Sequence, residues 1–303
     1  MKKIKYFLIE TRAPFLTVTI FPVLLGTFIA FRRNGVFSLL NFALMFFTAV
    51  FLHLGTNVIN DYFDNESGTD NINKEFASPF TGGSRMIQLG FLASKEVLIE
   101  GLILFVLGLG FGLFTAWRLH SVMFLSGVII GFISGFFYTA PFFNWAGKGL
   151  GELLAGVNFG IIFTAGGYFV QTGTITPEVV MASLPLAVLA SLILLINEFQ
   201  DYNADKQVGK KNLVVRWGRK PASEIYKYAL ILCYPIVCLN IWLGCYNISS
   251  TLVFLSLPLA VKAISISGRY YDNPKELTPA NKLTILCFNI FGFIIPLSYL
   301  FKF

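Results

Sequence analysis

Long apolar stretches without charged residues alternate with short polar segments along the whole 303-residue chain. A helix needs roughly 20 consecutive, mostly apolar residues to cross the hydrocarbon core of a bilayer. By this criterion the pattern predicts nine transmembrane helices, in the ranges 13–31, 37–59, 97–117, 121–143, 151–171, 179–198, 228–246, 249–267 and 283–301. We therefore expect an all-α, multi-pass integral membrane protein that contacts the lipid bilayer along most of its surface.

The composition excludes other classes of protein. Hydrophobic residues make up 55% of the chain and charged residues only 13%, whereas soluble domains carry roughly 25% charged residues. The mean hydropathy is +0.70. Disordered chains and coiled coils need many more polar and charged positions than this chain has, so neither is its main architecture.

The net charge of +7 is explained by membrane topology, without nucleic-acid binding. Cytoplasmic segments of membrane proteins carry an excess of Lys and Arg. If the N-terminus lies in the cytoplasm, all basic residues fall in predicted cytoplasmic segments except Arg32, Arg33, Arg118 and Lys302. We therefore expect a protein of the cell inner membrane whose N-terminus faces the cytoplasm, with no nucleic acid as a partner.

Acidic residues concentrate in two similar motifs at the cytoplasmic ends of the second and sixth predicted helices. The first motif contains Asn57, Asp61 and Asp64, and the second contains Asn197, Asp201 and Asp205. Residues at these helical spacings share one face of a helix, so each trio forms one polar face. The repetition also predicts two pseudo-repeated halves, about 13–143 and 151–303, within a single domain that spans residues 1–303.

Several carboxylates at one membrane edge repel one another, and an ionised side chain within a span costs about 2.5–3.5 kcal/mol. A divalent cation would offset both effects, and ligands that are all oxygen atoms favour Mg²⁺. The predicted catalytic and metal-binding residues are Asp61, Asp64, Asp201 and Asp205, with Asp70 as a further candidate metal ligand. Two alternative interpretations of these clusters are solvated acidic loops that cap two helices, and a monovalent-cation or proton site in a transporter.

Basic residues follow both acidic motifs on the same side of the membrane. Carboxylates, Mg²⁺ and Lys or Arg side chains together form a site for a diphosphate group. The chain has no G-x-x-x-x-G-K-[ST] loop that would bind phosphate in another way. The predicted diphosphate-binding residues are Asn57, Asn197, Arg85, Lys206, Lys210 and Arg216.

Three groups of residues resemble the UbiA superfamily of intramembrane prenyltransferases. They are Asn60-Asp61-Tyr62-Phe63-Asp64 with Gly68-Thr69-Asp70, Tyr138-Thr139-Ala140-Pro141 with Gly149-Leu150-Gly151-Glu152, and Asp201 to Asp205 with Gly209-Lys210 and Val215-Arg216-Trp217-Gly218. Within the superfamily they are most similar to the menaquinone branch, the 1,4-dihydroxy-2-naphthoate polyprenyltransferases. The resemblance extends over essentially the whole chain.

The resemblance implies nine helices around a central cavity, with a prenyl diphosphate held by Mg²⁺ between the two motifs at the cytoplasmic side. It further implies transfer of the polyprenyl group to an aromatic acceptor, 1,4-dihydroxy-2-naphthoate, which gives demethylmenaquinol. Tyr138 is then a candidate acceptor-binding residue, with a place in the interfacial aromatic belt as the alternative. Other acceptors remain open: a hydroxybenzoate, homogentisate or a glycerol phosphate lipid. No obligatory protein partner is evident from the sequence.

Overall fold

A computed structural model describes residues 2–78 and 80–301, and within these ranges the chain is helical and contains no β-strand. Eight segments in the described ranges are long and apolar enough to cross a membrane. They are Lys3–Asn34, Leu39–Glu66, Ser94–Arg118, Gly151–Thr172, Pro177–Gln207, Arg219–Trp242, Ile248–Tyr270 and Pro274–Ser298. The prediction of an all-α protein with many membrane passes is confirmed.

The fourth predicted span is shorter than the sequence pattern indicated. It contains α6 (Val122–Phe136), which has 15 residues, and the chain then folds back, so that the backbone N–H of Ala146 donates to the carbonyl of Tyr138 at 2.9 Å. Pro141 lacks a donor N–H and disfavours a helical residue before it, so an apolar run up to 143 does not produce a helix of that length. Eight of the nine predicted spans coincide with long helices, and the count of nine is not confirmed.

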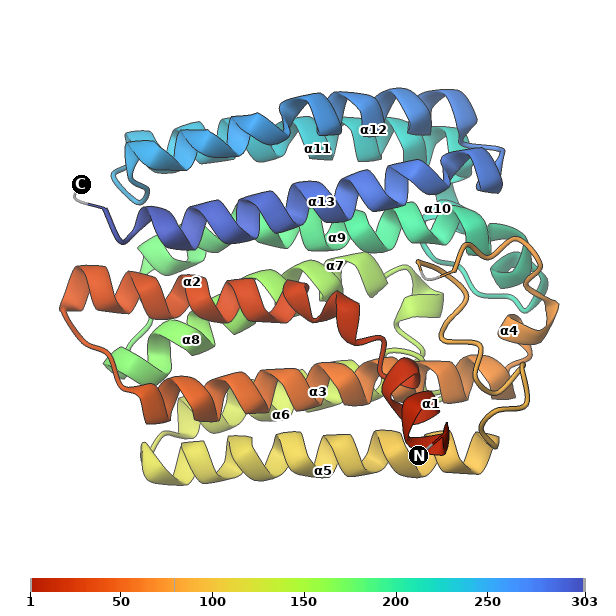
Figure 1. Cartoon of the computed structure of the whole chain (residues 1–303), viewed down its shortest axis with the longest axis horizontal. Helices are drawn as coiled ribbons and strands as arrows, with labels where there is room; N and C mark the ends of the chain where they lie inside the picture. Colours follow the sequence, from red (N-terminus) through yellow and green to blue (C-terminus); the bar gives the residue numbers. More distant parts are fainter. Residues whose placement is uncertain (1, 79, 302–303) are drawn as a thin grey trace.

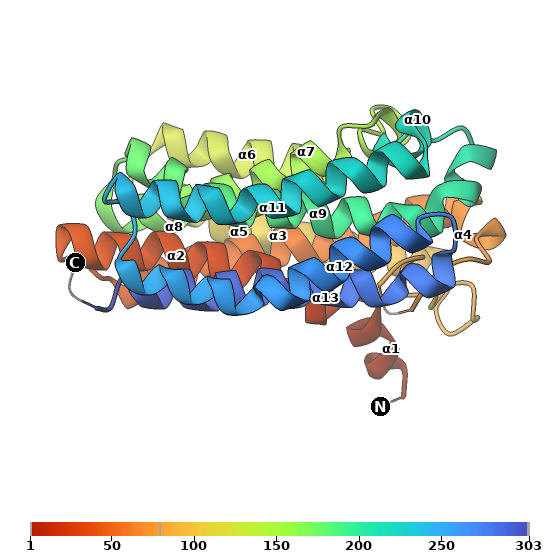
Figure 2. The ribbon, with the colours of Figure 1, turned by 90° about the horizontal axis from the view of Figure 1, so that it is seen from above.

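The helices lie side by side with their long axes roughly parallel (Figure 1). Single long helices are α2 (Thr17–Asn34), α3 (Leu39–Glu66), α5 (Ser94–Arg118), α9 (Pro177–Gln207), α11 (Arg219–Trp242) and α13 (Pro274–Ser298). Two further spans are composite: α7 (Gly151–Ala155) continues through a π-helical segment, Gly156–Ile162, into α8 (Phe163–Thr172), and a 3₁₀ segment, Ile248–Ser256, leads into α12 (Leu257–Tyr270). The N-terminal helix α1 (Lys2–Glu10) projects from the side of the bundle, toward one of its ends (Figure 2).

Helix α9 occupies the interior of the bundle, where it contacts α2, α8, α11 and α13. Its apolar side chains point in every direction, and Val179, Leu186 and Ile196 are fully buried. A helix that is apolar on all faces is stable only when other helices surround it. The second acidic motif, in roughly the last three turns of α9, is therefore held by the most enclosed of the described membrane-spanning helices.

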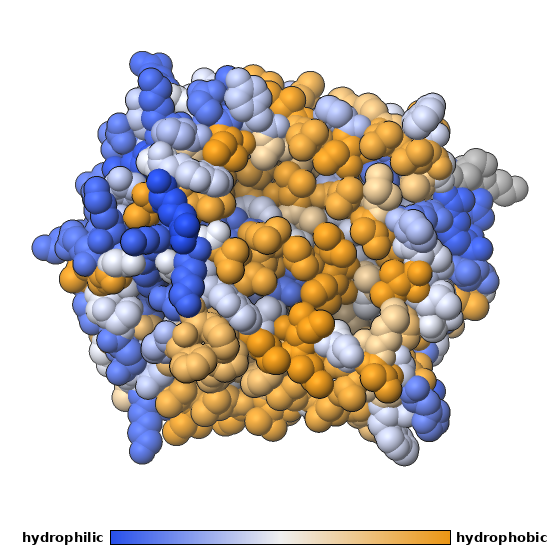
Figure 3. All heavy atoms as spheres, turned by 180° about the vertical axis from the view of Figure 1, so that it is seen from behind, coloured by the Kyte–Doolittle hydropathy of each residue, from blue (hydrophilic) through white to orange (hydrophobic). Residues whose placement is uncertain are grey.

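A broad apolar surface separates two polar ends of the molecule (Figure 3). One end carries α1, α4 (Thr69–Ile72) and α10 (Leu213–Trp217), and the connections from α3 to α5 and from α9 to α11 lie there (Figure 1). Arg32, Arg33 and Arg118 belong to the last turns of α2 and α5, at the other end, and Lys302 lies outside the described residues. The predicted separation of basic segments is thus seen in the fold, whereas the compartment that each end faces stays a prediction.

Candidate functional site

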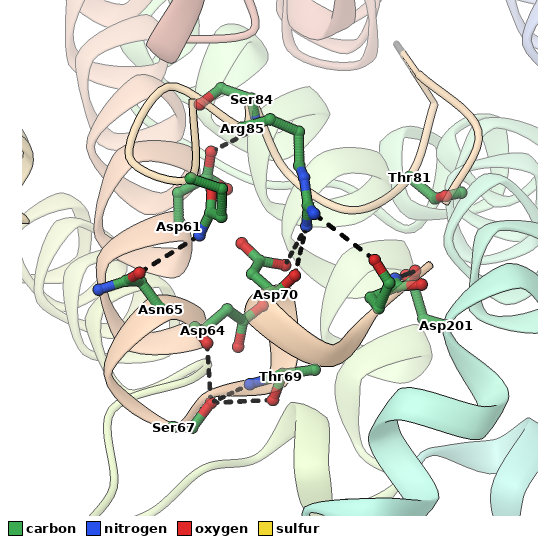
Figure 4. A network of polar contacts seen from close by, with 12 residues as sticks. Asp61, Asp64, Asn65, Ser67, Thr69, Asp70, Thr81, Ser84, Arg85 and Asp201 are labelled. Carbon is green, nitrogen blue, oxygen red and sulfur yellow. Dashed lines mark hydrogen bonds and ion pairs between the residues drawn. The ribbon is translucent and has the colours of Figure 1, made fainter. Parts of the chain in front are cut away.

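The two acidic motifs meet at one end of the bundle, around a polar cavity. The ends of α3 and α9 form two of its sides, and α4 with the loop before α5 forms another. Figure 4 shows Asp64, Asp70 and Asp201 approaching one another from these three elements. The charged side chains that line the cavity are Arg12, Asp64, Asp70, Glu198, Asp201, Asp205 and Lys210.

Asp61 lies beside this cavity, and contacts with Arg12 and Ser84 fix its carboxylate. Its Oδ1 is 3.1 Å from Nη2 of Arg12, and its Oδ2 accepts a 2.7 Å hydrogen bond from the backbone N–H of Ser84. The Ser84 hydroxyl in turn donates to the carboxylate of Glu10 at the end of α1. The N-terminal segment and the loop after α4 therefore fix the orientation of Asp61 on α3.

Gly83, next to Ser84, has a backbone φ of +70°, and a Cβ at this position would lie 2.8 Å from Oδ1 of Asp61. Gly83→Ala should therefore destabilise the protein by about 1–3 kcal/mol through steric overlap, in addition to the roughly 1–2 kcal/mol that a left-handed conformation costs an alanine. The midpoint of thermal unfolding in detergent measures this. Gly90→Ala is the matched control, since its φ is +71° and no atom lies within 4 Å of its Cβ position. Equal unfolding midpoints for the two variants would contradict the packing of Gly83 against Asp61.

Lys210 connects the two motifs through its ammonium group. Its Nζ lies 2.5 Å from Oδ1 of Asp64 on α3 and 3.7 Å from Oδ1 of Asp205 on α9. Burial lowers the pKa of Lys210, but the carboxylates of Asp64 and Asp205 outweigh this effect and raise the pKa above its ordinary value. The side chain of Asn212 donates a 2.8 Å hydrogen bond to the other oxygen of Asp205. A permanent positive charge thus lies between the two acidic motifs.

Asp70 and Arg85 form the third side of the acidic cluster (Figure 4). Nη1 of Arg85 donates a 2.6 Å hydrogen bond to the backbone carbonyl of Asp70 and lies 3.9 Å from its carboxylate. Burial, together with the neighbouring carboxylates of Asp64 and Asp61, raises the pKa of Asp70 to about 9. A cation or a hydrogen-bond donor is therefore needed at this point if all the carboxylates are to be ionised together.

The remaining motif side chains make hydrogen bonds deeper in the bundle. Asp201 accepts a 2.7 Å hydrogen bond from the side chain of Asn73. Asn57 donates to the carbonyl of Thr11 at 3.1 Å, and Asn197 accepts a 2.7 Å hydrogen bond from the side chain of Asn281. Both predicted asparagines thus line a cavity; Asn57 also binds the turn after α1, and Asn197 links α9 to α13.

Four predicted diphosphate-binding residues do not line the polar cavity: Asn57, Arg85, Lys206 and Arg216. The last two also lie away from it. Lys206 is exposed, with its Nζ 5.6 Å from the centre of the Tyr202 ring. The guanidinium group of Arg216 donates to the backbone carbonyls of Lys211 and Lys148, at 2.7 and 2.8 Å. Neither side chain lines the cavity, so we expect Lys206 and Arg216 to contribute less to diphosphate binding than Lys210 does.

A second, largely apolar cavity adjoins the polar one and extends between the helices. Six residues line both cavities: Arg12, Asn60, Phe80, Tyr138, Leu194 and Asn197. The deeper walls include Phe15, Leu52, Phe159 and Ile193, and also His53, whose Nδ1 is 2.7 Å from the hydroxyl of Thr19. A polar cavity that continues into an apolar one is suited to a ligand with a charged head and a hydrocarbon tail.

The donor atoms of the polar cavity fit Mg²⁺. Carboxylate and amide oxygens are available from Asp64, Asp70, Asp201, Asp205 and Asn73, and oxygen ligands are those that Mg²⁺ prefers. Within residues 2–78 and 80–301, no group of three or more His, Cys, Asp or Glu side chains is arranged so that it could hold a metal ion by itself. Mg²⁺ is commonly bound through one or two carboxylates together with phosphate oxygens of a substrate, so this donor set suits a metal that binds together with a diphosphate.

Three residues of the polar cavity were not identified from the sequence. Arg12 is one of many basic residues in the predicted cytoplasmic segments, and Asn73 lies in an irregular segment after α4. Glu198 follows Asn197 but is not part of the predicted helix face. For Glu198 a signal was present, because an acidic residue inside an apolar span is rare without a function. For Arg12 and Asn73 no local pattern indicates their long-range contacts.

Comparison with known proteins provides independent information. A model of the UbiA prenyltransferase family matches residues 19–292. The 2-carboxy-1,4-naphthoquinone phytyltransferase of Synechocystis sp. is 25% identical over 97% of this chain and 93% of its own length. The 1,4-dihydroxy-2-naphthoate octaprenyltransferase of Bacillus subtilis is 28% identical over 97% of this chain and 91% of its own length. Among solved structures, a UbiA homolog from Archaeoglobus fulgidus bound to DMAPP and Mg²⁺ has a similar fold, with a TM-score of 0.61 at 17% identity over 95% of this chain and 97% of that one.

Proposed function

The chain belongs to the UbiA prenyltransferase family, and on this basis we propose that it transfers a polyprenyl group from a prenyl diphosphate to 1,4-dihydroxy-2-naphthoate in a Mg²⁺-dependent reaction that gives demethylmenaquinol. The observation that carries the proposal is the continuous pair of cavities, one lined by aspartates and Lys210, the other by aromatic and aliphatic side chains. The names of the relatives from Bacillus subtilis and Synechocystis support a naphthoate-type acceptor.

The polar cavity is suited to the diphosphate of the donor. Asp61, Asp64, Asp201 and Asp205 are the proposed Mg²⁺ ligands, with Asp70 as a further one, and the metal would neutralise the diphosphate and make it a better leaving group. Lys210 and Arg12 line the same space and supply positive charge to the phosphate oxygens that the metal leaves uncovered. Both cations are fixed in place before a substrate arrives, so little reorganisation is needed as charge develops on the leaving diphosphate.

The reaction then takes place where the two cavities join. The bond between the allylic carbon and the diphosphate oxygen breaks, and its electron pair leaves with pyrophosphate. The electron-rich ring of the acceptor attacks the allylic carbon, and the ring carboxylate of the naphthoate leaves as carbon dioxide, which restores the aromatic ring. Residues that line both cavities, among them Tyr138 and Asn197, are positioned to contact the two substrates together.

The proposed location is the cell inner membrane, with the N-terminus and active site facing the cytoplasm. The basic residues at the end that carries α4 and α10 support this orientation, because cytoplasmic segments retain Lys and Arg. The single domain with two pseudo-repeated halves belongs to the same proposal, and each half contributes one acidic motif to the shared cavity. The position of the acidic clusters at one end of the bundle argues against the transporter alternative, in which charged groups lie near the bilayer midplane.

An acceptor panel with metal removal tests the proposal. The purified protein in lipid nanodiscs, given Mg²⁺, a prenyl diphosphate and 1,4-dihydroxy-2-naphthoate, should release pyrophosphate and form a prenylated naphthoquinol, as detected by mass spectrometry. Excess EDTA should abolish the reaction, and added Mg²⁺ should restore it. Without the metal, the negatively charged aspartates repel the diphosphate. Preferential turnover of a hydroxybenzoate, homogentisate or a glycerol phosphate lipid would replace the acceptor, and full activity in EDTA would remove the metal from the mechanism.

A further inference from the structure

Two buried glutamates form a separate acidic pair beside the polar cavity. Glu152 lies at the start of α7 and is 4% exposed, and Glu198 lies on α9 and is 6% exposed. Glu198 lines the polar cavity, whereas Glu152 does not. Neither belongs to the predicted metal-binding or diphosphate-binding residues, so the pair has no role in the mechanism described above.

The two carboxyl groups are built into the fold by specific contacts. Oε1 of Glu152 accepts a 3.0 Å hydrogen bond from the backbone N–H of Leu213 at the start of α10. The carboxyl group of Glu198 lies close enough to that of Glu152 for the two to interact electrostatically. No N–H or O–H group of the described residues donates to Oε2 of either glutamate. The pair thus has hydrogen-bonding capacity that the described part of the protein does not use.

The charge around the pair differs from that around Asp61, Asp64 and Asp205. Asp61, Asp64 and Asp205 each lie within 4.0 Å of an Arg or Lys nitrogen, whereas in the described ranges no basic side chain forms an ion pair with Glu152 or Glu198. A buried acidic pair without a cation repels a diphosphate. It is complementary to a ligand that donates hydrogen bonds, such as an aromatic hydroxyl group.

Glu198 also lies where such a ligand would have to bind, near the junction of the polar and apolar cavities. It precedes Asp201 by about one helical turn on α9, and its neighbours Leu194 and Asn197 line both cavities. The carboxyl group therefore lies between the aspartates and the apolar cavity. A ring placed there would have its apolar face toward Leu194 and Phe80 and would be adjacent to the reacting end of the donor.

Tyr138 completes the surroundings of Glu198. It lines both cavities, and burial together with the charges of Glu198 and Glu152 raises its pKa well above the ordinary value, so its hydroxyl remains a hydrogen-bond donor. The hydroxyl lies 3.0 Å from the position that a Cβ of Gly151 would occupy. Glycine at this position, immediately before Glu152, therefore allows the ring of Tyr138 to pack against the start of α7.

We propose that Glu198, supported by Glu152 and flanked by Tyr138, is the acceptor subsite, in which its carboxyl group accepts a hydrogen bond from a ring hydroxyl of the aromatic acceptor. This inference rests on the proposed prenyl transfer to a hydroxylated ring. It gives Glu198 a role in choosing and orienting the acceptor, distinct from the role of the aspartates in binding the donor. The interaction would select hydroxylated rings over rings of the same size that lack a hydrogen-bond donor.

Steady-state kinetics with Glu198→Gln test the proposal in the full-length protein. Glutamine keeps the size of the side chain but replaces the charge-assisted hydrogen bond, so the KM for 1,4-dihydroxy-2-naphthoate should rise about tenfold or more. The KM for the prenyl diphosphate and the Mg²⁺ concentration for half-maximal activity should remain unchanged. Glu224→Gln, an exposed glutamate on α11, is the matched control and should behave like the wild type.

A measurement on the wild-type protein covers the case in which Glu198→Gln does not fold. Methyl ethers of 1,4-dihydroxy-2-naphthoate, with one ring hydroxyl blocked in each, should include one that binds at least tenfold more weakly than the parent compound. An unchanged acceptor KM in Glu198→Gln, equal binding of all ethers, or a raised requirement for Mg²⁺ or donor would each overturn the subsite. If the wild type prenylates no hydroxylated ring at all, the proposed function itself fails, and this outcome is distinct from a failure of the subsite alone.

Discussion

Replacing Asp201 by asparagine should abolish prenyl transfer and leave the fold intact. Asparagine has nearly the same volume, and its side-chain oxygen can still accept the hydrogen bond from Asn73, so the substitution removes only the negative charge in the polar cavity. Loss of one preorganised electrostatic group typically costs about 10²–10³-fold in kcat, and loss of a metal ligand should cost at least as much. Pyrophosphate release and product formation by purified protein measure the effect.

Asp272→Asn is the control for this substitution. Asp272 is exposed in the turn between α12 and α13 and does not line either cavity, so its replacement should leave turnover unchanged. The unfolding midpoints of both variants should stay close to that of the wild type. If Asp201→Asn retained more than about a tenth of wild-type activity, Asp201 would not be an essential ligand, because such a loss is smaller than a single electrostatic group typically causes.

Replacing Lys210 by methionine should lower both activity and stability. Methionine keeps most of the length of the side chain but leaves the buried carboxylates of Asp64 and Asp205 without the cation that lies 2.5 and 3.7 Å away. Breaking a buried ion pair by removing one partner costs about 3–5 kcal/mol, and the diphosphate also loses a positive charge. We expect a lower unfolding midpoint and at least a tenfold higher KM for the prenyl diphosphate.

Lys206→Met is the matched control for Lys210→Met. Both lysines follow the second acidic motif, but Lys206 is exposed and does not line the polar cavity. Its replacement should change the donor KM by less than about twofold. The attraction between an exposed lysine and the diphosphate is weak because water and salt screen it. Lys210→Arg, which keeps the charge, should recover part of the affinity. Equal effects of the two methionine variants would mean that the diphosphate lies nearer the membrane surface than proposed.

Lys206 and Lys210 have similar positions in the sequence, but their side chains point in different directions. Both were predicted to bind diphosphate because they follow the same motif. In the structure, the chain turns after α9 so that Lys210 points between α3 and α9 and Lys206 points outward. Lys206 belongs to the last turn of α9, whereas Lys210 follows its end, in a segment that Asn212 links back to Asp205 by a hydrogen bond.

The sequence by itself determined the class of the protein and singled out its two acidic motifs. Eight of nine spans followed from apolar length, because a bilayer imposes a minimum length on any helix that crosses it. The acidic motifs stood out because ionised residues are costly near a membrane and are rarely present without a function. Neither inference needs knowledge of how the helices pack.

Tertiary structure alone decided which residues share the site. Arg12, Asn73 and Glu198 reach the polar cavity from three different segments, and Pro141 with the turn behind it shortened α6 in spite of its apolar surroundings. These outcomes depend on contacts between residues far apart in the chain, which no local periodicity records. Helix length is imposed by the bilayer, whereas the neighbours of a carboxylate are set by how the ends of α3 and α9 pack together.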